Sequence, residues 1–390
     1  MTTDHTRTTS HDLAVAIIGT GYVGLTTGVC LAHLGAHVTC CDVDERKVTL
    51  LKQGVVPIVE DGLAEVMQGA IDAGRLSFVV GNDPAVRTAD VVFLCVPTPQ
   101  DEDGSADLSY VRAAATEIGP ILKAGAVVVN KSTVPVGSFG VVGETLGRDD
   151  VSVVSNPEFL REGTAMHDFL NPDRVVIGAD DERAAQMVAA LYAGLDTEFV
   201  FTDPTSAELI KYAANGFLAM KISFINSVAA LCEHVGGDIS SVVRGIGTDK
   251  RIGKQFLQPG PGWGGSCFPK DSRALVSTAA QHGFDFSLMR GVIDINEQQY
   301  DRMVHKVMAA VGRDVSLDGI VVGALGLTFK AGTDDLRESP ALRIVDSLRA
   351  RGATVQAYEP TAVGELNPIQ RERLAGIELK TSALDAAQGA

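Results

Sequence analysis

The sequence predicts an α/β protein with an N-terminal Rossmann-like doubly wound sheet, a long central helix within a helical middle domain, and an incomplete C-terminal Rossmann-like domain. Three observations support this fold class. Short runs rich in Val and Ile alternate with helical segments, a glycine-rich turn follows the first run, and residues 205–235 contain no proline. Such alternation is typical of parallel sheets that carry helices on both faces.

The expected strands are short apolar runs between turn residues, as in parallel strands buried on both faces. Helical segments between them are expected at residues 23–34, 45–52 and 108–122. The strands are expected at residues 14–18, 37–41, 76–80, 91–96, 126–130 and 151–155, and two more, near 174–177 and 198–201, extend the sheet.

The segment 205–235 has apolar residues on more than one face. As a helix it would be roughly 45 Å long at 1.5 Å per residue. A helix of this kind is buried between domains or in a subunit interface. More helices are expected up to about residue 311.

Strand–helix alternation then resumes, but only two clear strands are visible, and a sheet of that size buries little surface. These elements are expected at residues 319–325, 341–351, 354–358 and 382–388. The sequence therefore predicts three domains, at residues 12–204, 205–312 and 313–390.

Composition narrows the functional class. The 390 residues are 45% hydrophobic and 21% charged, which suits a globular chain of two or three domains. A net charge of −16 argues against nucleic-acid binding. The six cysteines form no Cys-x-x-Cys pair and the histidines show no metal-ligand spacing, so no disulfide or metal site is expected. With neither a signal peptide nor a membrane-spanning apolar run evident, we expect a cytoplasmic protein with no membrane partner.

A dinucleotide-binding turn is the first functional motif. Gly19-Thr20-Gly21-Tyr22-Val23-Gly24 follows the first expected strand and opens a helix. The three glycines permit a tight turn, close approach to a pyrophosphate and close helix packing. Asp42 ends the second strand, where a carboxylate accepts a ribose hydroxyl and favours NAD over NADP. Lys47 lies one helical turn further and could reach the same nucleotide.

The run Gly-Gly-Ser-Cys-Phe-Pro-Lys-Asp at residues 264–271 places Cys267 just ahead of an expected helix, with Pro269 in its first turn. Proline suits this position, and the unpaired N–H groups of a helix start carry positive partial charge. A cysteine at such a terminus tends to have a lowered pKa and to be a thiolate nucleophile. Together with the dinucleotide turn, it predicts an enzyme that oxidises a substrate and holds it covalently.

Two pairs of polar residues are each spaced four apart. Glu158 and Glu162, in Asn-Pro-Glu-Phe-Leu-Arg-Glu-Gly (156–163), would share a helix face if that turn is helical. A carboxylate there could activate water, but acidic residues also simply stabilise a helix start. Lys211 and Asn215 lie on the expected long helix and could project together into a cleft. A lysine stabilises a developing alkoxide, and an asparagine donates a hydrogen bond or holds water.

Other candidates are weaker individually. Residues 95–99 and 131–135 follow the fourth and fifth strands, where open α/β sheets bind ligands, but such Pro-containing turns are also common in ordinary loops. Charged loop residues are usually only solvated. The candidate anion contacts of this kind are Arg251, Lys254, Lys330 and Arg337.

Together these motifs resemble the UDP-glucose 6-dehydrogenase family of the nucleotide-sugar dehydrogenases, from residue 14 to about 358. The specific matches are residues 264–271, residues 156–163 and the Lys-x-x-x-Asn spacing at 211–215. The resemblance implies that a cysteine forms a thiohemiacetal and then a thioester, that two NAD⁺ are reduced, and that water releases the acid. The residues matched to catalytic roles are Cys267, Lys211, Asn215, Asp271, Glu158 and Thr133, the last two handling water.

The resemblance also implies NAD as cofactor, UDP-glucose as substrate, and a homodimer or larger homo-oligomer in which Arg251 reaches the sugar across the interface. Gln258 stands where some members have Lys, and the family's UDP-binding domain normally continues for several more elements. The expected NAD contacts are Gly19, Thr20, Gly21, Tyr22, Val23, Gly24, Asp42, Lys47, Pro97, Thr98, Ser132, Thr133, Glu162, Lys270 and Arg337. The expected substrate contacts are Glu158, Phe159, Leu160, Arg161, Glu162, Lys211, Asn215, Arg251, Phe256, Gln258, Gly262, Gly264, Phe329 and Lys330.

Three alternatives remain open at this point. The same chemistry could act on UDP-N-acetylmannosamine or GDP-mannose, because the reacting-centre motifs are shared. A two-electron hydroxyacid dehydrogenase shares the Rossmann domain and a Lys-x-x-x-Asn pair but leaves Cys267 unexplained. A non-catalytic NAD-binding regulatory protein is disfavoured by the complete set of Cys, Lys, Asn and Asp positions.

Overall fold

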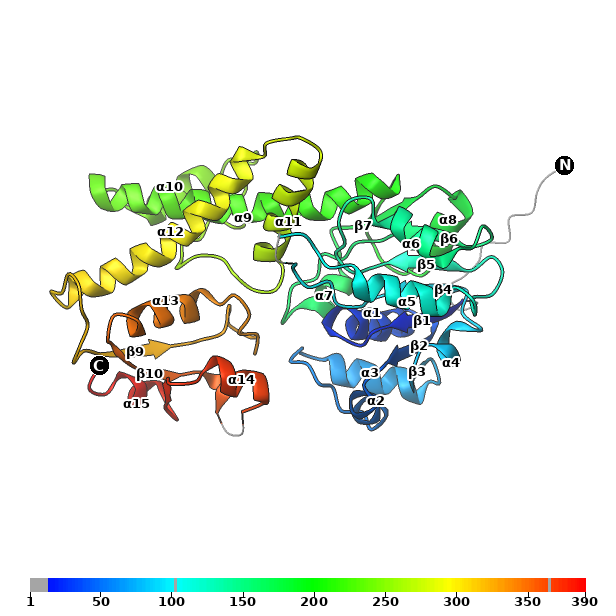
Figure 1. Cartoon of the computed structure of the whole chain (residues 1–390), viewed down its shortest axis with the longest axis horizontal. Coiled ribbons are helices and arrows are strands. Elements are labelled where there is room, and N and C mark those ends of the chain that lie inside the picture. Colours follow the sequence, from blue (N-terminus) through cyan, green and yellow to red (C-terminus); the bar gives the residue numbers. More distant parts are fainter. Residues whose placement is uncertain (1–12, 102–103, 364–365) are drawn as a thin grey trace. The chain divides into compact units, whose positions relative to one another are not determined.

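The computed structural model describes residues 13–101, 104–363 and 366–390 (Figure 1). The chain divides into two compact units, Met1–Tyr212 and Ala213–Ala390, and each is described by itself.

The first unit is built on an eight-stranded sheet in the order β3-β2-β1-β4-β5-β6-β7-β8. Neighbouring strands are parallel except β6 and β7, which run antiparallel. All eight expected strands are present, so the predicted doubly wound sheet is confirmed. The strands are β1 (Ala14–Ile18), β2 (His37–Asp42), β3 (Leu76–Val80), β4 (Val91–Leu94), β5 (Val127–Asn130), β6 (Ser152–Ser155), β7 (Arg174–Ala179) and β8 (Glu198–Thr202).

Helices cover both faces of this sheet. In β1, Val15 and Ile17 join one buried apolar cluster, while Ala16 and Ile18 join the cluster on the other face. This alternation explains why the strands read as continuous apolar runs. The helices are α1 (Tyr22–His33), α2 (Glu45–Lys52), α3 (Leu63–Asp72), α4 (Asp83–Val86), α5 (Ser109–Ile118), α6 (Ser138–Leu146), α7 (Ala165–Leu170) and α8 (Glu182–Ala190).

The long helix expected at residues 205–235 is confirmed as α9 (Pro204–Val235), which has 32 residues and begins one residue earlier. The boundary between the two units falls within it. Among the described residues it is the one helix that is long and apolar enough to cross a membrane. Long core helices of other proteins pass the same test of length and composition, so the expected absence of a membrane partner stays a prediction.

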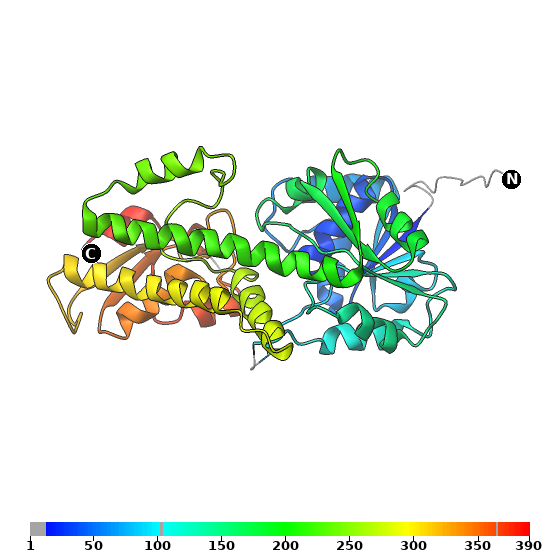
Figure 2. The ribbon, with the colours of Figure 1, turned by 90° about the horizontal axis from the view of Figure 1, so that it is seen from above.

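The second unit places further helices and a small parallel sheet after the start of α9. Figure 2 shows α12 beside α9, where Ser223 Oγ donates to the Val292 carbonyl at 2.9 Å. The sheet has the order β11-β10-β9, so the two strands expected from sequence gain a third, two-residue strand. The elements are α10 (Ile239–Gly247), α11 (Phe268–Gln281), α12 (Ser287–Ala310), β9 (Val321–Leu325), α13 (Pro340–Arg349), β10 (Thr354–Tyr358), α14 (Pro368–Arg373), β11 (Glu378–Leu379) and α15 (Ala383–Ala387).

Candidate active site

The glycine-rich turn after β1 has the geometry that a dinucleotide requires. Gly19 has φ +92°, and a Cβ on Gly24 would lie 1.9 Å from the Gly19 carbonyl oxygen, so neither position tolerates a side chain. A Cβ on Gly21 would meet no atom within 4 Å. The turn therefore packs tightly on its inner side and leaves open space beside Gly21, at the N-terminus of α1, where a pyrophosphate fits.

Asp42 ends β2 beside this turn. Its Oδ2 accepts the amide (2.9 Å) and hydroxyl (2.6 Å) of Thr20 and pairs with Lys47 Nζ at 3.0 Å. Burial would raise the pKa of Asp42, but hydrogen bonds from Thr20, from the Asp44 amide and from Lys47 outweigh it and lower the pKa to about 2. The carboxylate is therefore ionised throughout the range of enzyme assays, as the predicted choice of NAD requires.

We expect the protein to use NAD at least about tenfold more efficiently than NADP, in kcat/KM. Like unit charges 4 Å apart repel by about 4 kcal/mol at an effective dielectric constant of about 20, an upper figure for this partly solvated carboxylate. The Asp42→Asn variant should lose much of the preference, whereas Asp44→Asn, which changes the neighbouring N-cap of α2, should keep it. Equal use of both cofactors by the wild-type protein would remove the role given to Asp42.

Tyr22 ties the glycine-rich turn to the segment after β6. Its hydroxyl donates to Glu60 and accepts the Gly163 amide at 2.7 Å. Burial first, and then Glu60, raise the pKa of Tyr22, so the hydroxyl stays protonated. Glu60 was not a candidate from sequence, because it lies in an irregular segment between α2 and α3 with no recognisable motif. Its contact with Tyr22 helps to fix the loop that carries Glu162.

The loops after β4 and β5 come together, as expected for neighbouring parallel strands. Thr98 Oγ1 donates to the Thr133 carbonyl at 2.9 Å, and Ser132 Oγ donates to the Val96 carbonyl at 2.6 Å. Pro97 is exposed between these contacts. The topology thus places these predicted NAD contacts at the strand ends that bind ligands in open α/β sheets.

Glu158 and Lys211 form a buried ion pair. Lys211 Nζ lies 2.9 Å from Glu158 Oε1, and their side chains are 4% and 5% exposed. Glu158 Oε2 also accepts the Leu160 amide at 2.6 Å, and Lys211 Nζ lies 5.4 Å from the Phe159 ring centroid. The pair brings together two residues that the sequence proposed separately.

The expectation that Glu158 and Glu162 share a helix face is wrong. Residues 156–161 form a loop, and a helix begins only at Ala165. In this loop Arg161 instead turns to Asp168, with Nη2 2.5 Å from Oδ1. Glu158 in the same loop pairs with the buried Lys211, so the two glutamates lie in different local environments.

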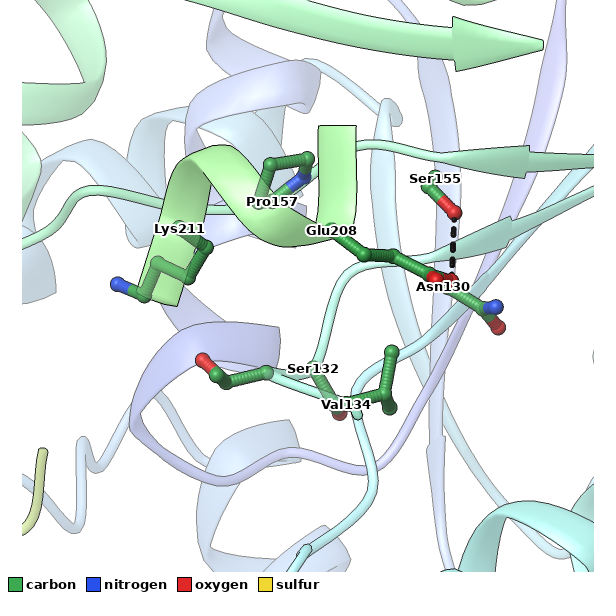
Figure 3. Close-up of a pocket in the computed structure, with 8 residues that line it drawn as sticks. Asn130, Ser132, Val134, Ser155, Pro157, Glu208 and Lys211 are labelled. Atoms are coloured by element: carbon green, nitrogen blue, oxygen red, sulfur yellow. Dashed lines mark hydrogen bonds between the residues drawn. The ribbon is translucent and has the colours of Figure 1, made fainter. Parts of the chain in front are cut away.

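A small pocket lies beside this pair (Figure 3). It is lined by Asn130, Ser132, Thr133, Val134, Ser155, Pro157, Glu208 and Lys211.

Next to it, Lys131 is buried and donates to Asn156 Oδ1 (3.0 Å) and Tyr192 Oη (3.2 Å). Burial lowers the pKa of Lys131 to about 8. Sequence analysis named Lys131 only as part of the strand-end motif 131–135 and missed Glu208, for which a charged residue inside an otherwise apolar helix is the signal that could have found it.

In the second unit, Cys267 is the N-cap of α11, with Pro269 in the first turn, as predicted. Asp271 lies in that first turn and is fully buried. Its Oδ2 accepts a hydrogen bond from Asn215 Nδ2 at 2.6 Å, and Lys270 Nζ lies 2.9 Å from its Oδ1. Asp271 therefore links Lys270, its neighbour in the first turn of α11, with Asn215 of α9.

The glycines that precede Cys267 allow the chain to pass close to the C-terminal segment. A Cβ on Gly264 would lie 1.9 Å from the Glu338 carbonyl oxygen, and one on Gly262 would lie 2.5 Å from the Tyr300 ring. Phe256 has φ +60°, and its ring packs 6.3 Å from Phe268. These predicted substrate contacts thus form one tightly packed loop region.

The remaining cationic candidates lie nearer the surface. The Arg251 side chain is 88% exposed and pairs with Asp249, and the Arg337 side chain is 62% exposed and pairs with Asp335. Lys330 lies over the Phe329 ring at 5.6 Å, and Gln258 is exposed. Their roles towards NAD and substrate stay predictions. Within the described ranges, no cluster of three or more His, Cys, Asp or Glu has a geometry that holds a metal ion.

Comparison with known proteins agrees with this arrangement. Residues 13–196 match the NAD binding domain of the UDP-glucose/GDP-mannose dehydrogenase family, residues 205–298 its central domain and residues 323–390 its UDP binding domain. A UDP-glucose 6-dehydrogenase of Bacillus subtilis is 47% identical over 365 residues, which cover 92% of this chain and 78% of that protein.

Solved structures give the same result. A UDP-glucose dehydrogenase from Pyrobaculum islandicum superposes with a TM-score of 0.92 and 39% identity, covering 97% of this chain and 89% of that one. A UDP-D-ManNAc dehydrogenase from Pyrococcus horikoshii has a TM-score of 0.81 and 28% identity, covering 92% and 86%. The predicted family and its cofactor, NAD, are confirmed. The chain belongs to the UDP-glucose/GDP-mannose dehydrogenase family.

Proposed function

We propose that this protein is an NAD-dependent UDP-glucose 6-dehydrogenase, which oxidises UDP-glucose to UDP-glucuronate in two successive two-electron steps. The observation that carries the proposal is Cys267 at the N-cap of α11, in a chain that also carries a dinucleotide-binding turn. The 47%-identical relative is named for this activity, and the 28%-identical UDP-D-ManNAc dehydrogenase is more distant.

In the first step the primary alcohol loses a proton and a hydride and becomes an aldehyde. NAD, when bound, supplies the hydride acceptor for this oxidation and for the next. Lys211 is positioned to stabilise the alkoxide that forms as the proton leaves, and Glu158 holds its ammonium group in place. Asn215 is held by Asp271, which orients its amide.

In the second step the Cys267 thiolate adds to the aldehyde carbon, and the aldehyde oxygen takes up a proton to give a thiohemiacetal. Loss of that proton and of a second hydride, for which a second NAD would be the acceptor, converts this adduct into a thioester, so the sulfur keeps the oxidised carbon attached to the protein. Water then attacks the thioester carbonyl, the C–S bond breaks, and the carboxylate and the thiol are released. Thr133 and Glu158 are the residues proposed to hold and activate this water.

The stoichiometry tests the covalent route. We expect two NADH for each UDP-glucose consumed, with little free aldehyde, because the thiol captures the aldehyde before it can leave. The measurement is NADH absorbance against UDP-glucuronate and remaining sugar, with an aldehyde-trapping reagent as a control. A ratio of one with released aldehyde would contradict the covalent mechanism.

The same assay across UDP-glucose, UDP-N-acetylmannosamine and GDP-mannose tests the substrate. Preference for one of the other two nucleotide-sugars would reassign the substrate and leave the chemistry standing. NAD binding without NADH formation from any of them would favour the regulatory alternative.

The expected location of the protein is the cytoplasm, which is consistent with six free cysteines in the described structure.

The proposed active form is a homodimer that pairs through α9. Phe217, Phe224 and Leu231 lie seven residues apart on this helix and are 58%, 55% and 60% exposed in the single chain. A row of large apolar side chains at this spacing lies along one helix face and is typical of a helix-packing surface. A second copy would bury it with two-fold symmetry.

We expect Arg251→Ala to raise the KM for UDP-glucose more than the KM for NAD, because its exposed guanidinium is proposed to reach the partner's sugar site. Phe224→Glu should weaken the dimer, which light scattering at assay concentration measures. A fully active wild-type monomer would rule out the shared site. An unchanged KM for the sugar in Arg251→Ala would rule out this residue alone.

A further inference from the structure

Glu208 is a buried carboxylate with no part in the mechanism above. It lies on α9 and is 4% exposed. Its Oε2 accepts the Gly137 amide at 2.6 Å, and its Oε1 accepts the Phe139 amide at 2.9 Å and the Ser155 hydroxyl at 3.1 Å. One side chain therefore joins α9 to the start of α6 and to the end of β6.

These contacts replace a missing helix cap. The N-cap residue of α6 is Gly137, which has no side chain to accept the free amides of the first turn. Glu208 accepts two of the backbone amides at this end instead, and the positive end of the helix favours its charge. Burial raises the pKa of Glu208 to about 7 against the opposing effect of these donors, so the carboxylate is mainly ionised at pH 8.5.

The segment fixed in this way carries Thr133. We call residues 131–137, between β5 and α6, the Thr133 loop. Its beginning is held by the hydrogen bonds of Ser132 and Thr98, and its end is held by Glu208. Figure 3 shows Glu208 reaching from α9 to Ser155, while Lys211, one turn further along, leaves the same helix in the opposite direction. Glu208 thus connects the Thr133 loop to the helix that carries Lys211.

We propose that Glu208 is a positioning residue that holds the Thr133 loop against α9 and so sets the place of Thr133 for hydrolysis of the thioester. The role in hydrolysis rests on the proposed function; the anchoring of the loop does not. Misplacement of a reacting group by about 1 Å can cost roughly a hundredfold in rate, so a lost anchor should affect the step that Thr133 serves.

Hydrogen exchange at pH 8.5 tests the anchor directly. Glu208→Ala should speed amide exchange in peptides that cover residues 131–141 by at least about tenfold, because two amides lose a charged acceptor. Glu208→Gln keeps the volume but directs an NH₂ group at one of these donors, so it should act in the same direction. Asp181→Asn is the matched control, since Asp181 also joins a helix start to β6, through Ser152 at 2.7 Å.

Kinetics test the role in hydrolysis. In both Glu208 variants kcat should fall roughly ten- to a hundredfold, and the KM for UDP-glucose should fall with it, because slower hydrolysis lets the acyl-enzyme accumulate while kcat/KM for the sugar stays nearly unchanged. Rapid mixing should show a burst of NADH before a slow steady state, since acyl-enzyme accumulates. Unchanged exchange in folded Glu208→Gln would overturn the anchor. Faster exchange with wild-type kcat and no burst would overturn the role in hydrolysis. An inactive wild-type protein would instead contradict the proposed function. The hydrogen-exchange rates of the Glu208 variants would then still show whether Glu208 anchors the Thr133 loop.

Discussion

Replacing Cys267 by Ser is expected to abolish sustained oxidation of UDP-glucose while NAD binding survives. Serine keeps the size of the side chain, but its hydroxyl is a weaker nucleophile than a thiolate and the ester it can form is harder to hydrolyse than a thioester. We expect turnover to fall by at least roughly a thousandfold, or to stall at a covalent ester. NADH formation gives the rate, and intact-protein mass spectrometry detects the ester.

A second cysteine supplies the control. Cys232 is buried on α9 in the same unit and has no proposed role in catalysis. Cys232→Ser should change stability by a small amount and leave the NADH stoichiometry as in the wild-type protein. Near-normal turnover of Cys267→Ser would defeat the assignment of the nucleophile, even if the family activity is present.

The sheet of the first unit was predictable because its pattern is local. Runs such as Val127–Asn130 are continuously apolar and bounded by turns, so each strand is evident without its neighbours. The antiparallel pairing of β7 with β6 was not predictable in this way, because strand direction depends on the path of the connection and not on the strand's own residues. Short helices such as α7 and α14 were missed because six residues show little periodicity.

The site was predictable where its geometry depends on residues that are adjacent in sequence. The glycine-rich turn and the Cys267 N-cap depend on residues adjacent in sequence, and both are found where expected. Contacts between segments that are distant in sequence could not be predicted. Nothing near Glu158 indicates that its partner is Lys211, 53 residues later, and the four-residue spacing to Glu162 suggested a helix instead. Pairing across the fold determines which polar residues are buried.

Lys211→Met is expected to nearly abolish oxidation and also to destabilise the protein. Removing one member of a buried ion pair leaves an uncompensated charge, at a cost of about 3–5 kcal/mol in the free energy of unfolding. Glu158→Gln should destabilise the protein at least as much. The charge of Glu158 favours the protonated form of the buried Lys131, and without this carboxylate the charges of Lys131 and Lys211 would oppose each other. Denaturant unfolding and NADH formation measure the two effects separately.

The double variant distinguishes a catalytic role from a structural one. With both charges removed, Lys211→Met/Glu158→Gln should recover much of the lost stability, because replacing a whole buried pair by neutral groups is often close to neutral. Activity should stay lost, since neither the cation for the alkoxide nor the carboxylate for water returns. Lys221 supplies the control: it lies on the same helix, and its described contact is a hydrogen bond to the Ile252 carbonyl. Lys221→Met should lower the free energy of unfolding by about 1 kcal/mol or less and keep activity. Recovery of activity together with stability in the double variant would show that the pair supports the fold and that other residues carry the chemistry.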